Sequence, residues 1–211
     1  GVASTKAFTT QLAQLMVLGV AIARCRDLSE ERELNLLRTL SGVSDQIKQI
    51  WRLQPELQSL AKQLSTKSYI QFLGRGPMYP VAMEGALKLK EISYITAEAY
   101  AAGELKHGPL AMVDSEVPVI ALAPPNRLLS KMKANMSEVA ARGGQLIVLT
   151  DEITAATLPR DMRAIVLPET SSLLAPILYT IPLQLLAYYV ALERGKDVDK
   201  PRNLAKAVTV E

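Results

Sequence analysis

From residue 68 onward, short apolar runs alternate with stretches that have helical spacing. The apolar runs, which predict strands, cover residues 69–73, 97–100, 117–122, 145–149 and 164–167. Helical spacing between them predicts helices over residues 79–94, 103–112 and 127–142, with a weaker one over 153–157. Neighbouring parallel strands need long crossover connections, and helices supply them. The alternation therefore predicts an α/β fold, a three-layer αβα sandwich around a five-stranded parallel sheet.

The chain before this alternation is helical in pattern throughout. Residues 7–25 are apolar around much of the expected helix, so this helix must be covered by other parts of a protein. Residues 26–65 are predicted to be a helical connector. Within it a helical region starts at Ser29, a capping residue followed by acidic side chains.

Neither a membrane span nor a secretory signal is expected. A long apolar helix is predicted over 171–194, but Pro176 and Pro182 interrupt it, which indicates a buried helix. No charged start followed by an apolar core and a small-residue cleavage site is present. Cys25 is the single cysteine and cannot form an internal disulfide, which favours a reducing, cytoplasmic location. The chain opens on Gly1 instead of Met, as expected for a piece of a longer protein.

Composition narrows the class of protein further. With 211 residues, the chain can bury a full core and has length left for a partial second unit. A hydrophobic content of 49% with only 5% aromatic residues suits an α/β protein better than an all-β one. The net charge is +3, and there is neither a Lys/Arg cluster nor aromatic residues spaced for base stacking, so nucleic acid is not an expected partner.

Residues 81–112 hold the densest candidate chemistry. At about 100° per residue, Glu84, Lys88 and Glu91 share an arc of roughly 60° beside the apolar side of their helix, and Lys90 points away. The simplest interpretation is a charge ladder on a solvated helix face. The same region contains His107, the only histidine, between a lysine and a Gly-Pro break. Imidazole exchanges protons near neutral pH, although a lone histidine is more often structural than catalytic.

Several common kinds of site are excluded because the sequence lacks their motifs. The turn Gly74-Arg75-Gly76-Pro77 follows the first predicted strand but lacks the third glycine of a dinucleotide site. There is also no Walker A lysine, no Cys/His set for a metal and no serine nucleophile elbow. We therefore expect neither a dinucleotide cofactor nor a zinc site.

Four stretches resemble one known family: Leu73-Gly-Arg-Gly, Glu84-Gly-Ala-Leu-Lys-Leu-Lys-Glu-Ile-Ser-Tyr, Glu98-Ala-Tyr-Ala-Ala-Gly-Glu-Leu-Lys-His-Gly-Pro-Leu-Ala and Pro201-Arg-Asn-Leu-Ala-Lys-Ala-Val-Thr-Val-Glu. They are similar to the isomerase portion of the glucosamine-6-phosphate synthases, the isomerising glutamine:fructose-6-phosphate aminotransferases. The opening Gly-Val-Ala-Ser-Thr-Lys-Ala-Phe-Thr-Thr-Gln matches as well, so the resemblance runs from end to end.

The resemblance implies a fold and a division of the chain. The family's isomerase portion has two sugar-isomerase (SIS) subdomains of flavodoxin-like type. Residues 1–65 would then be the last helices of a truncated first subdomain and the connector, 66–194 the second subdomain, and 195–211 a C-terminal active-site loop. The family's glutaminase domain and most of its first subdomain are missing, so the chain alone is expected to be inactive.

The resemblance also assigns catalytic roles. Glu91 resembles the carboxylate that moves a proton between C1 and C2 of the sugar, and a base that serves two adjacent carbons is what ketose–aldose isomerisation needs. Lys206 resembles the lysine that forms an imine with fructose 6-phosphate, although without the resemblance it reads as a solvated tail lysine. Arg202 would supply positive charge near Lys206 if the tail is helical. His107 resembles the histidine that opens the sugar ring from a neighbouring subunit, and Lys88 a lysine near the sugar hydroxyls.

Binding positions and partners follow in the same way. Val2, Ser4 and Ala205 match substrate-contacting positions, Tyr79 and Arg75 are candidates for supporting or interdomain roles, and a homodimer with a shared active site is implied. Two other interpretations stay open: a non-catalytic sugar-phosphate-binding regulatory module, and a glutamine-independent deglycase or deaminase. The joint presence of the catalytic residues disfavours the binding module, because binding alone does not need them all.

Overall fold

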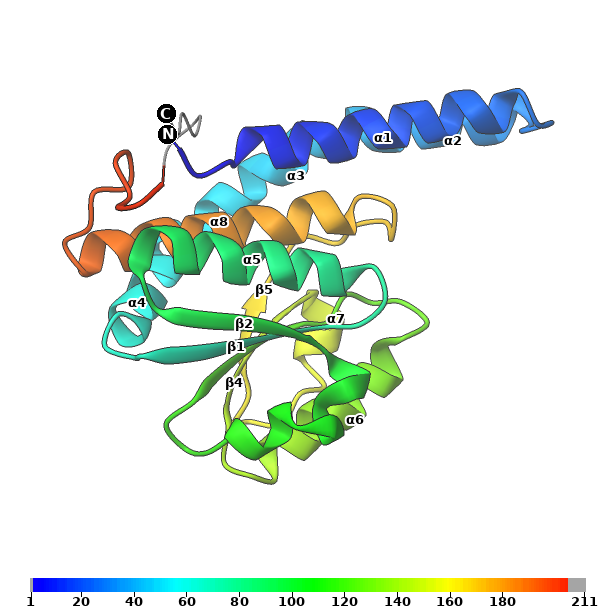
Figure 1. Cartoon of the computed structure of the whole chain (residues 1–211). Coiled ribbons are helices and arrows are strands. Elements are labelled where there is room, and N and C mark those ends of the chain that lie inside the picture. Colours follow the sequence, from blue (N-terminus) through cyan, green and yellow to red (C-terminus); the bar gives the residue numbers. More distant parts are fainter. Residues whose placement is uncertain (1, 205–211) are drawn as a thin grey trace.

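The computed structural model describes residues 2–204 and contains a five-stranded parallel sheet in the order β2-β1-β3-β4-β5 (Figure 1). The strands are β1 (Tyr69–Gly74), β2 (Thr96–Ala101), β3 (Pro118–Leu122), β4 (Gln145–Thr150) and β5 (Arg163–Val166). All neighbouring pairs run parallel. This confirms the predicted α/β sandwich, and β2 lies at one edge of the sheet.

Helices cover both faces of the sheet. One face packs against α4 (Gln54–Leu64), α5 (Met78–Ser93) and α8 (Ala175–Glu193), and the other against α6 (Leu129–Ala140) and the 3-10 helices η2 (Ala102–His107) and η3 (Pro109–Met112). A short helix, α7 (Glu152–Ala155), connects β4 to β5. Alternation along the strands feeds the two cores: Ile120 and Leu122 of β3 point to the α5/α8 side, and Val119 and Ala121 to the α6 side.

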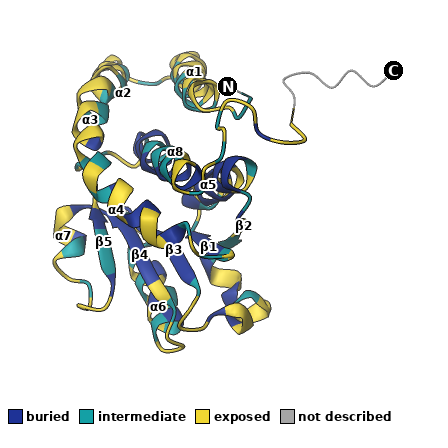
Figure 2. Cartoon of the chain, turned by 90° about the vertical axis from the view of Figure 1, so that its left-hand side faces the viewer, coloured by how far each residue is buried: buried dark blue, intermediate teal, exposed yellow. Residues whose placement is uncertain are grey.

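The N-terminal helices lie over the outer side of α8. These are α1 (Lys6–Arg24), α2 (Glu30–Ser41), α3 (Val43–Ile50) and the 3-10 helix η1 (Trp51–Leu53). A small cluster of buried residues, among them Ile50 and Leu178, joins α3 to α8, with Leu12 and Met16 of α1 packed against it. Figure 2 shows the central strands β1, β3 and β4 largely buried, the edge strands less so, and α1 and α2 largely exposed.

Among residues 2–204, two helices, α1 and α8, are apolar and long enough to cross a membrane by length and composition. In α8, 61% of the apolar window is buried, which confirms the predicted core helix. In α1 no residue is buried within the described chain, so the expected cover is not supplied by residues 2–204.

The helix expected over 103–112 is wrong. The segment forms η2 and η3, which are separated at Gly108. Gly108 has φ +134, a value that L side chains rarely adopt, and Pro109 has no N–H to continue a helix. The Gly-Pro pair therefore divides the segment and turns His107 into the last residue of a short 3-10 helix.

Candidate functional site

A buried lysine between two carboxylates forms the centre of the candidate site. Lys88 Nζ lies 2.6 Å from Glu91 Oε2 and 3.8 Å from Glu84 Oε1. The Lys88 side chain is only 4% exposed, and Glu91 is half-buried. All three side chains come from consecutive turns of α5, whose i, i+3 and i, i+4 spacing places them on one stripe. The alternative of a solvated charge ladder is wrong, whereas Lys90 is exposed as predicted.

Glu84 is the member of this stripe that the sequence did not single out as a site residue. The pKa of Glu84 is raised overall. Burial is the largest cause and raises it, the charge of Lys88 lowers it, and the charge of Glu91 raises it. The Oε1 atom of Glu84 has no hydrogen-bond partner among the described residues. Glu84 shares the helical spacing of Lys88, so the stripe was visible in the sequence, but its burial was not.

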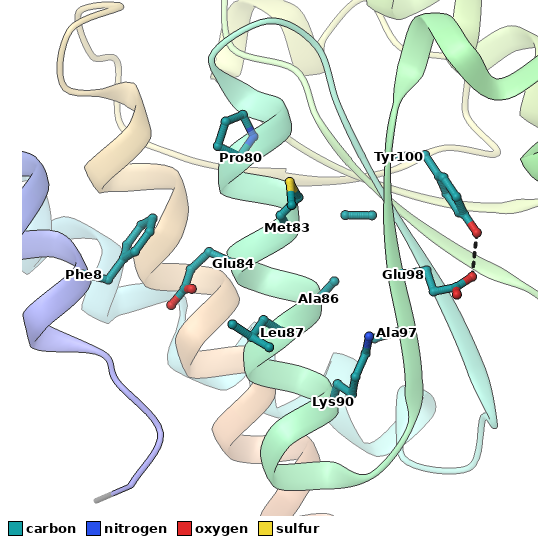
Figure 3. Close-up of a pocket in the computed structure, with 11 residues that line it drawn as sticks. Phe8, Pro80, Met83, Glu84, Ala86, Leu87, Lys90, Ala97, Glu98 and Tyr100 are labelled. Carbon is teal, nitrogen blue, oxygen red and sulfur yellow. Dashed lines mark hydrogen bonds between the residues drawn. The ribbon is translucent and has the colours of Figure 1, made fainter. Parts of the chain in front are cut away.

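An open cavity of about 510 Å³ lies between α5 and the edge strand β2 (Figure 3), and of the stripe only Glu84 lines it. Its lining is mostly apolar and includes Met83 and Leu87 of α5 and Ala97 of β2. Phe8 of α1 closes one side, and the Glu84 side chain points from α5 toward Phe8. At the opposite side, Tyr100 donates a 2.5 Å hydrogen bond to Glu98, whose pKa is lowered by this bond and by a second one from Tyr69.

The two ends of the described chain meet the same layer of helices. Gln184 of α8 donates to the backbone oxygen of Thr5 at 3.3 Å, and Ala3 packs against the α5/α8 core, as does Val198, which follows α8. Figures 1 and 2 both place the first described residues beside residues 195–204. The candidate binding residues Val2, half-buried, and Ser4, exposed, flank Ala3 in this segment.

The C-terminal tail, which we define as residues 195–204, docks at the end of α5. The backbone N–H of Arg202 donates to the Tyr94 hydroxyl at 2.8 Å, three residues beyond Glu91. The tail is not helical around Arg202, because Pro201 cannot donate and Asn203 has φ +61. The role suggested for Arg202 required a helical tail, and the described part of the tail is not helical. Lys206 and Ala205 lie outside the described residues.

His107 lies away from Glu91 within the chain. Glu91 precedes β2 at the end of α5, whereas His107 follows β2, so the whole strand separates them. The His107 side chain is 74% exposed, and its Nδ1 is 2.8 Å from Glu104 Oε2. Its segment is tied to the body of the fold by Lys106, which pairs with Glu138 of α6 at 3.0 Å.

Arg75 supports the same segment from the end of β1. Its guanidinium donates to Asn135 of α6 at 2.9 Å, and a Cβ added to Gly103 would stand 3.0 Å from Arg75. Arg75 therefore has a supporting contact inside the α/β unit. Tyr79 is half-buried near the start of α5. Among residues 2–204, no group of three or more His, Cys, Asp or Glu side chains lies close enough to hold a metal ion.

Comparisons with known proteins agree with the fold and with the motifs. A family model described as SIS domain matches residues 63–194. The chain is 54% identical over 211 residues to the glutamine–fructose-6-phosphate aminotransferases (isomerizing) of Pectobacterium atrosepticum and of Escherichia coli. In both cases the match covers 100% of this chain and 35% of the relative, so the chain spans about a third of these curated proteins.

Solved structures extend the comparison. The C-terminal domain of glucosamine-fructose-6-phosphate aminotransferase from Francisella tularensis is 44% identical, with a TM-score of 0.91 over 94% of this chain and 56% of that one. A glucosamine-6-phosphate deaminase from Thermotoga maritima is 25% identical, with a TM-score of 0.65 over 99% of this chain and 58% of that one. The parallel sheet with its helices and the family match over most of the chain lead to one conclusion: the chain belongs to the SIS domain family.

Proposed function

We propose that this chain is the isomerase portion of an isomerising glutamine–fructose-6-phosphate aminotransferase, an enzyme of amino sugar biosynthesis. The complete protein converts fructose 6-phosphate and ammonia released from glutamine into glucosamine 6-phosphate. The observation that carries the proposal is the buried Lys88–Glu91 pair at the end of α5, with the C-terminal tail docked three residues beyond it. The 54% identity over the whole chain favours this activity over a non-catalytic module or a glutamine-independent deaminase.

The chemistry begins at the C2 carbonyl of open-chain fructose 6-phosphate. The amine of Lys206 adds to C2 and the carbonyl oxygen leaves as water, which forms an imine. Ammonia then adds to C2 and displaces the lysine, so the nitrogen stays on the sugar and Lys206 is regenerated. No metal or organic cofactor is needed for these steps, because the imine activates the carbonyl carbon.

Glu91 carries out the isomerisation. Its carboxylate removes a proton from C1, a C1–C2 double bond forms, and the electron pair of the C2–N double bond moves to nitrogen. Glu91 returns the proton to C2 while the C1 hydroxyl loses its own proton and becomes the carbonyl of the aldose. Lys88 holds Glu91 in place through the 2.6 Å contact and lies near the sugar hydroxyls. Val2, Ser4 and Ala205 contact the substrate.

His107 serves the site of a second copy, in which it opens the sugar ring. Its exposure, and its position at the other end of β2 from Glu91, support a role in a neighbouring site. The proposal therefore includes a cytoplasmic homodimer with a shared active site. Residues 1–65 belong with a first SIS subdomain, 66–194 form the second, and 195–211 form the active-site loop, although α4 already packs in the core of the second unit.

The test is a Glu91→Gln substitution in the complete protein, with the preceding domains present. Loss of the general base lowers formation of glucosamine 6-phosphate by about 10²- to 10⁴-fold, whereas glutamine hydrolysis continues. Product is measured with glutamine and, separately, with ammonium as the nitrogen source. Glu193→Gln, at the exposed end of α8, is the matched control and keeps full activity. Wild-type product formation by the Glu91→Gln protein would contradict the proposal.

A further inference from the structure

The C-terminal tail has a defined local structure. Gly195, with φ +63, ends α8, and its N–H donates to the Leu192 carbonyl at 2.9 Å. Asp197 Oδ1 then accepts from the backbone N–H groups of Asp199 at 2.9 Å and Lys200 at 3.2 Å. This turn seats the Val198 side chain against the α5/α8 core.

The turn presents the next residues to the end of α5. Pro201 is buried, and Arg202 follows at once. The Arg202 backbone N–H bonds to the Tyr94 hydroxyl at 2.8 Å, and its guanidinium carbon stands 4.3 Å from the centre of the Tyr94 ring. Lys196 Nζ lies 5.7 Å from the same ring. One tyrosine therefore holds the tail through a hydrogen bond and two cation–π contacts.

Tyr94 occupies a position that helix ends usually give to glycine. It caps α5 with φ +63 and ψ 20, and its N–H donates to the Lys90 carbonyl at 3.2 Å. A residue with a Cβ is strained in this left-handed conformation, where glycine is not. Ending the helix therefore does not explain a tyrosine here, whereas the contacts of its ring and hydroxyl with the tail do.

We propose that Tyr94 is a positioning residue that latches the C-terminal tail to the helix end carrying Glu91. Glu91 lies three residues before Tyr94, and Lys206 lies four residues after Arg202. Four residues of any chain reach at most about 14 Å, so fixing Arg202 limits the positions open to Lys206. The inference rests on the proposed function, in which the Lys206 amine and the Glu91 carboxylate act on adjacent carbons of one sugar.

This role predicts a particular pattern of effects. A catalytic group held about 1 Å out of place can cost up to about 10²-fold in rate. Loosening the tail therefore slows imine formation and kcat, while sugar binding through other residues keeps KM close to its wild-type value. A purely structural tyrosine would instead change overall stability and leave imine formation by the folded protein unchanged.

The experiment compares Tyr94→Phe and Tyr94→Leu in the complete protein. Tyr94→Phe removes the hydroxyl and keeps the ring for the two cations, and we expect an about 3- to 10-fold loss in kcat and in the rate at which borohydride traps the fructose 6-phosphate imine on Lys206. Tyr94→Leu removes both contacts, and we expect an about 100-fold loss. Hydrogen exchange of the amides of residues 196–204 speeds up in the same order. Tyr188→Phe, an exposed tyrosine of α8, is the matched control.

Unchanged tail exchange and imine trapping in both Tyr94 variants would overturn the latch. If Tyr94→Leu does not fold, Tyr94→Phe decides, because it keeps the bulk of the ring. A Lys206→Ala protein separates this result from the proposed function: full activity without Lys206 refutes the proposed chemistry whatever the tail does. If Lys206→Ala is inactive but both Tyr94 variants show the same tail exchange and imine trapping as the wild-type protein, only the latch is refuted.

Discussion

Lys88 is a charged side chain in a place where a lone charge would be costly. Burial of an ammonium group costs several kcal/mol unless opposite charge compensates, and here Glu91 and Glu84 supply two carboxylates. Two acids for one base leave the trio with an excess of negative charge. Burial raises the pKa of Glu84, which is the more buried carboxylate and the one farther from the ammonium.

The raised pKa of Glu84 predicts a pH dependence of stability. The folded protein holds this proton more tightly than the unfolded chain, so the contribution of Glu84 is complete below its unfolded pKa. It is lost as pH rises through the higher folded pKa. Because Gln does not titrate, the free energy of unfolding of wild type minus that of Glu84→Gln falls as pH rises through this window. Urea denaturation from pH 4 to pH 8 measures the difference.

Glu98→Gln gives the matched control of opposite sign. Hydrogen bonds from Tyr100 and Tyr69 lower the pKa of Glu98, so its contribution is present above the unfolded pKa and is lost as pH falls through the folded one. Its wild-type-minus-variant difference therefore rises with pH. If the Glu84 difference also rose with pH, Lys88 would dominate over burial and the assignment would be wrong.

The sequence predicted the direction in which these side chains leave their helix but not how far they are buried. A period of 3.6 residues gives directions, so the stripe of Glu84, Lys88 and Glu91 and the outward Lys90 were predictable. Burial depends on α8 and on Phe8 of α1, which are distant in sequence, and no local pattern contains that information. The role of Tyr94 was hidden for the same reason, because its partner Arg202 is 108 residues away.

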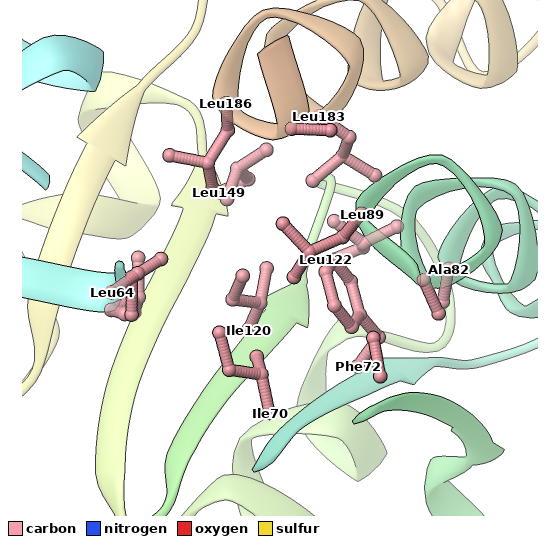
Figure 4. Close-up of a cluster of buried hydrophobic side chains, with 14 of the residues drawn as sticks. Leu64, Ile70, Phe72, Ala82, Leu89, Ile120, Leu122, Leu149, Leu183 and Leu186 are labelled. Atoms are coloured by element: carbon pink, nitrogen blue, oxygen red, sulfur yellow. The ribbon is translucent and has the colours of Figure 1, made fainter. Parts of the chain in front are cut away.

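At the scale of elements, α5 packs closely against α8. Gly85 lies inside α5, and an added Cβ would stand 2.6 Å from Leu183 Cδ1 and 3.1 Å from Phe72 Cε1. Figure 4 shows Leu183 of α8 and Phe72 of β1 beside α5 in this core. The missing side chain lets the two helices approach, and α5 carries the candidate site on the same turns.

Gly85→Ala is therefore expected to destabilise the protein, although alanine is the better helix former. Overpacking of a filled core costs about 1–3 kcal/mol, which exceeds the gain of about 1 kcal/mol in helix propensity. Gly19→Ala in α1 is the matched control, since nothing lies within 4 Å of its added Cβ, and it gains about 0.5–1 kcal/mol. Denaturant midpoints of the two variants test the difference. A stabilised Gly85→Ala protein would show that the α5–α8 interface adjusts freely.

Element prediction succeeded where a local pattern and the packing agree. The five strands were recognisable as short apolar runs, and α8 as a helix too interrupted for a membrane span. The prediction of a helix over 103–112 was wrong because it rested on helical spacing alone. Gly108 has a positive φ and lies in a turn between two 3-10 helices. The motif around His107 thus identified a candidate residue but did not predict where its side chain lies in the fold.

At the scale of the molecule, the described chain consists of a packed α/β unit and a helical layer that is open on its outer side. The SIS family match begins at residue 63, so α1 lies ahead of the matched unit. Its exposed residues Leu15 (62% exposed) and Leu18 (53% exposed) face outward. The relatives are about three times as long as this chain, with 35% of their length matched. We expect the preceding SIS subdomain of the complete protein to cover this face.

A double substitution, Leu15→Glu with Leu18→Glu, tests that cover. In the 211-residue chain the two side chains are exposed, so the change in the free energy of unfolding stays within about 0.5 kcal/mol. If the preceding subdomain covers α1 in the complete protein, we expect a loss of about 1.5–3 kcal/mol for each position. Leu12→Glu is the control, because Leu12 already packs against the α3–α8 cluster and must cost stability in both proteins. Equal effects of the double substitution in the two proteins would mean that α1 stays open to solvent, and the division at residue 65 would then lose its physical basis.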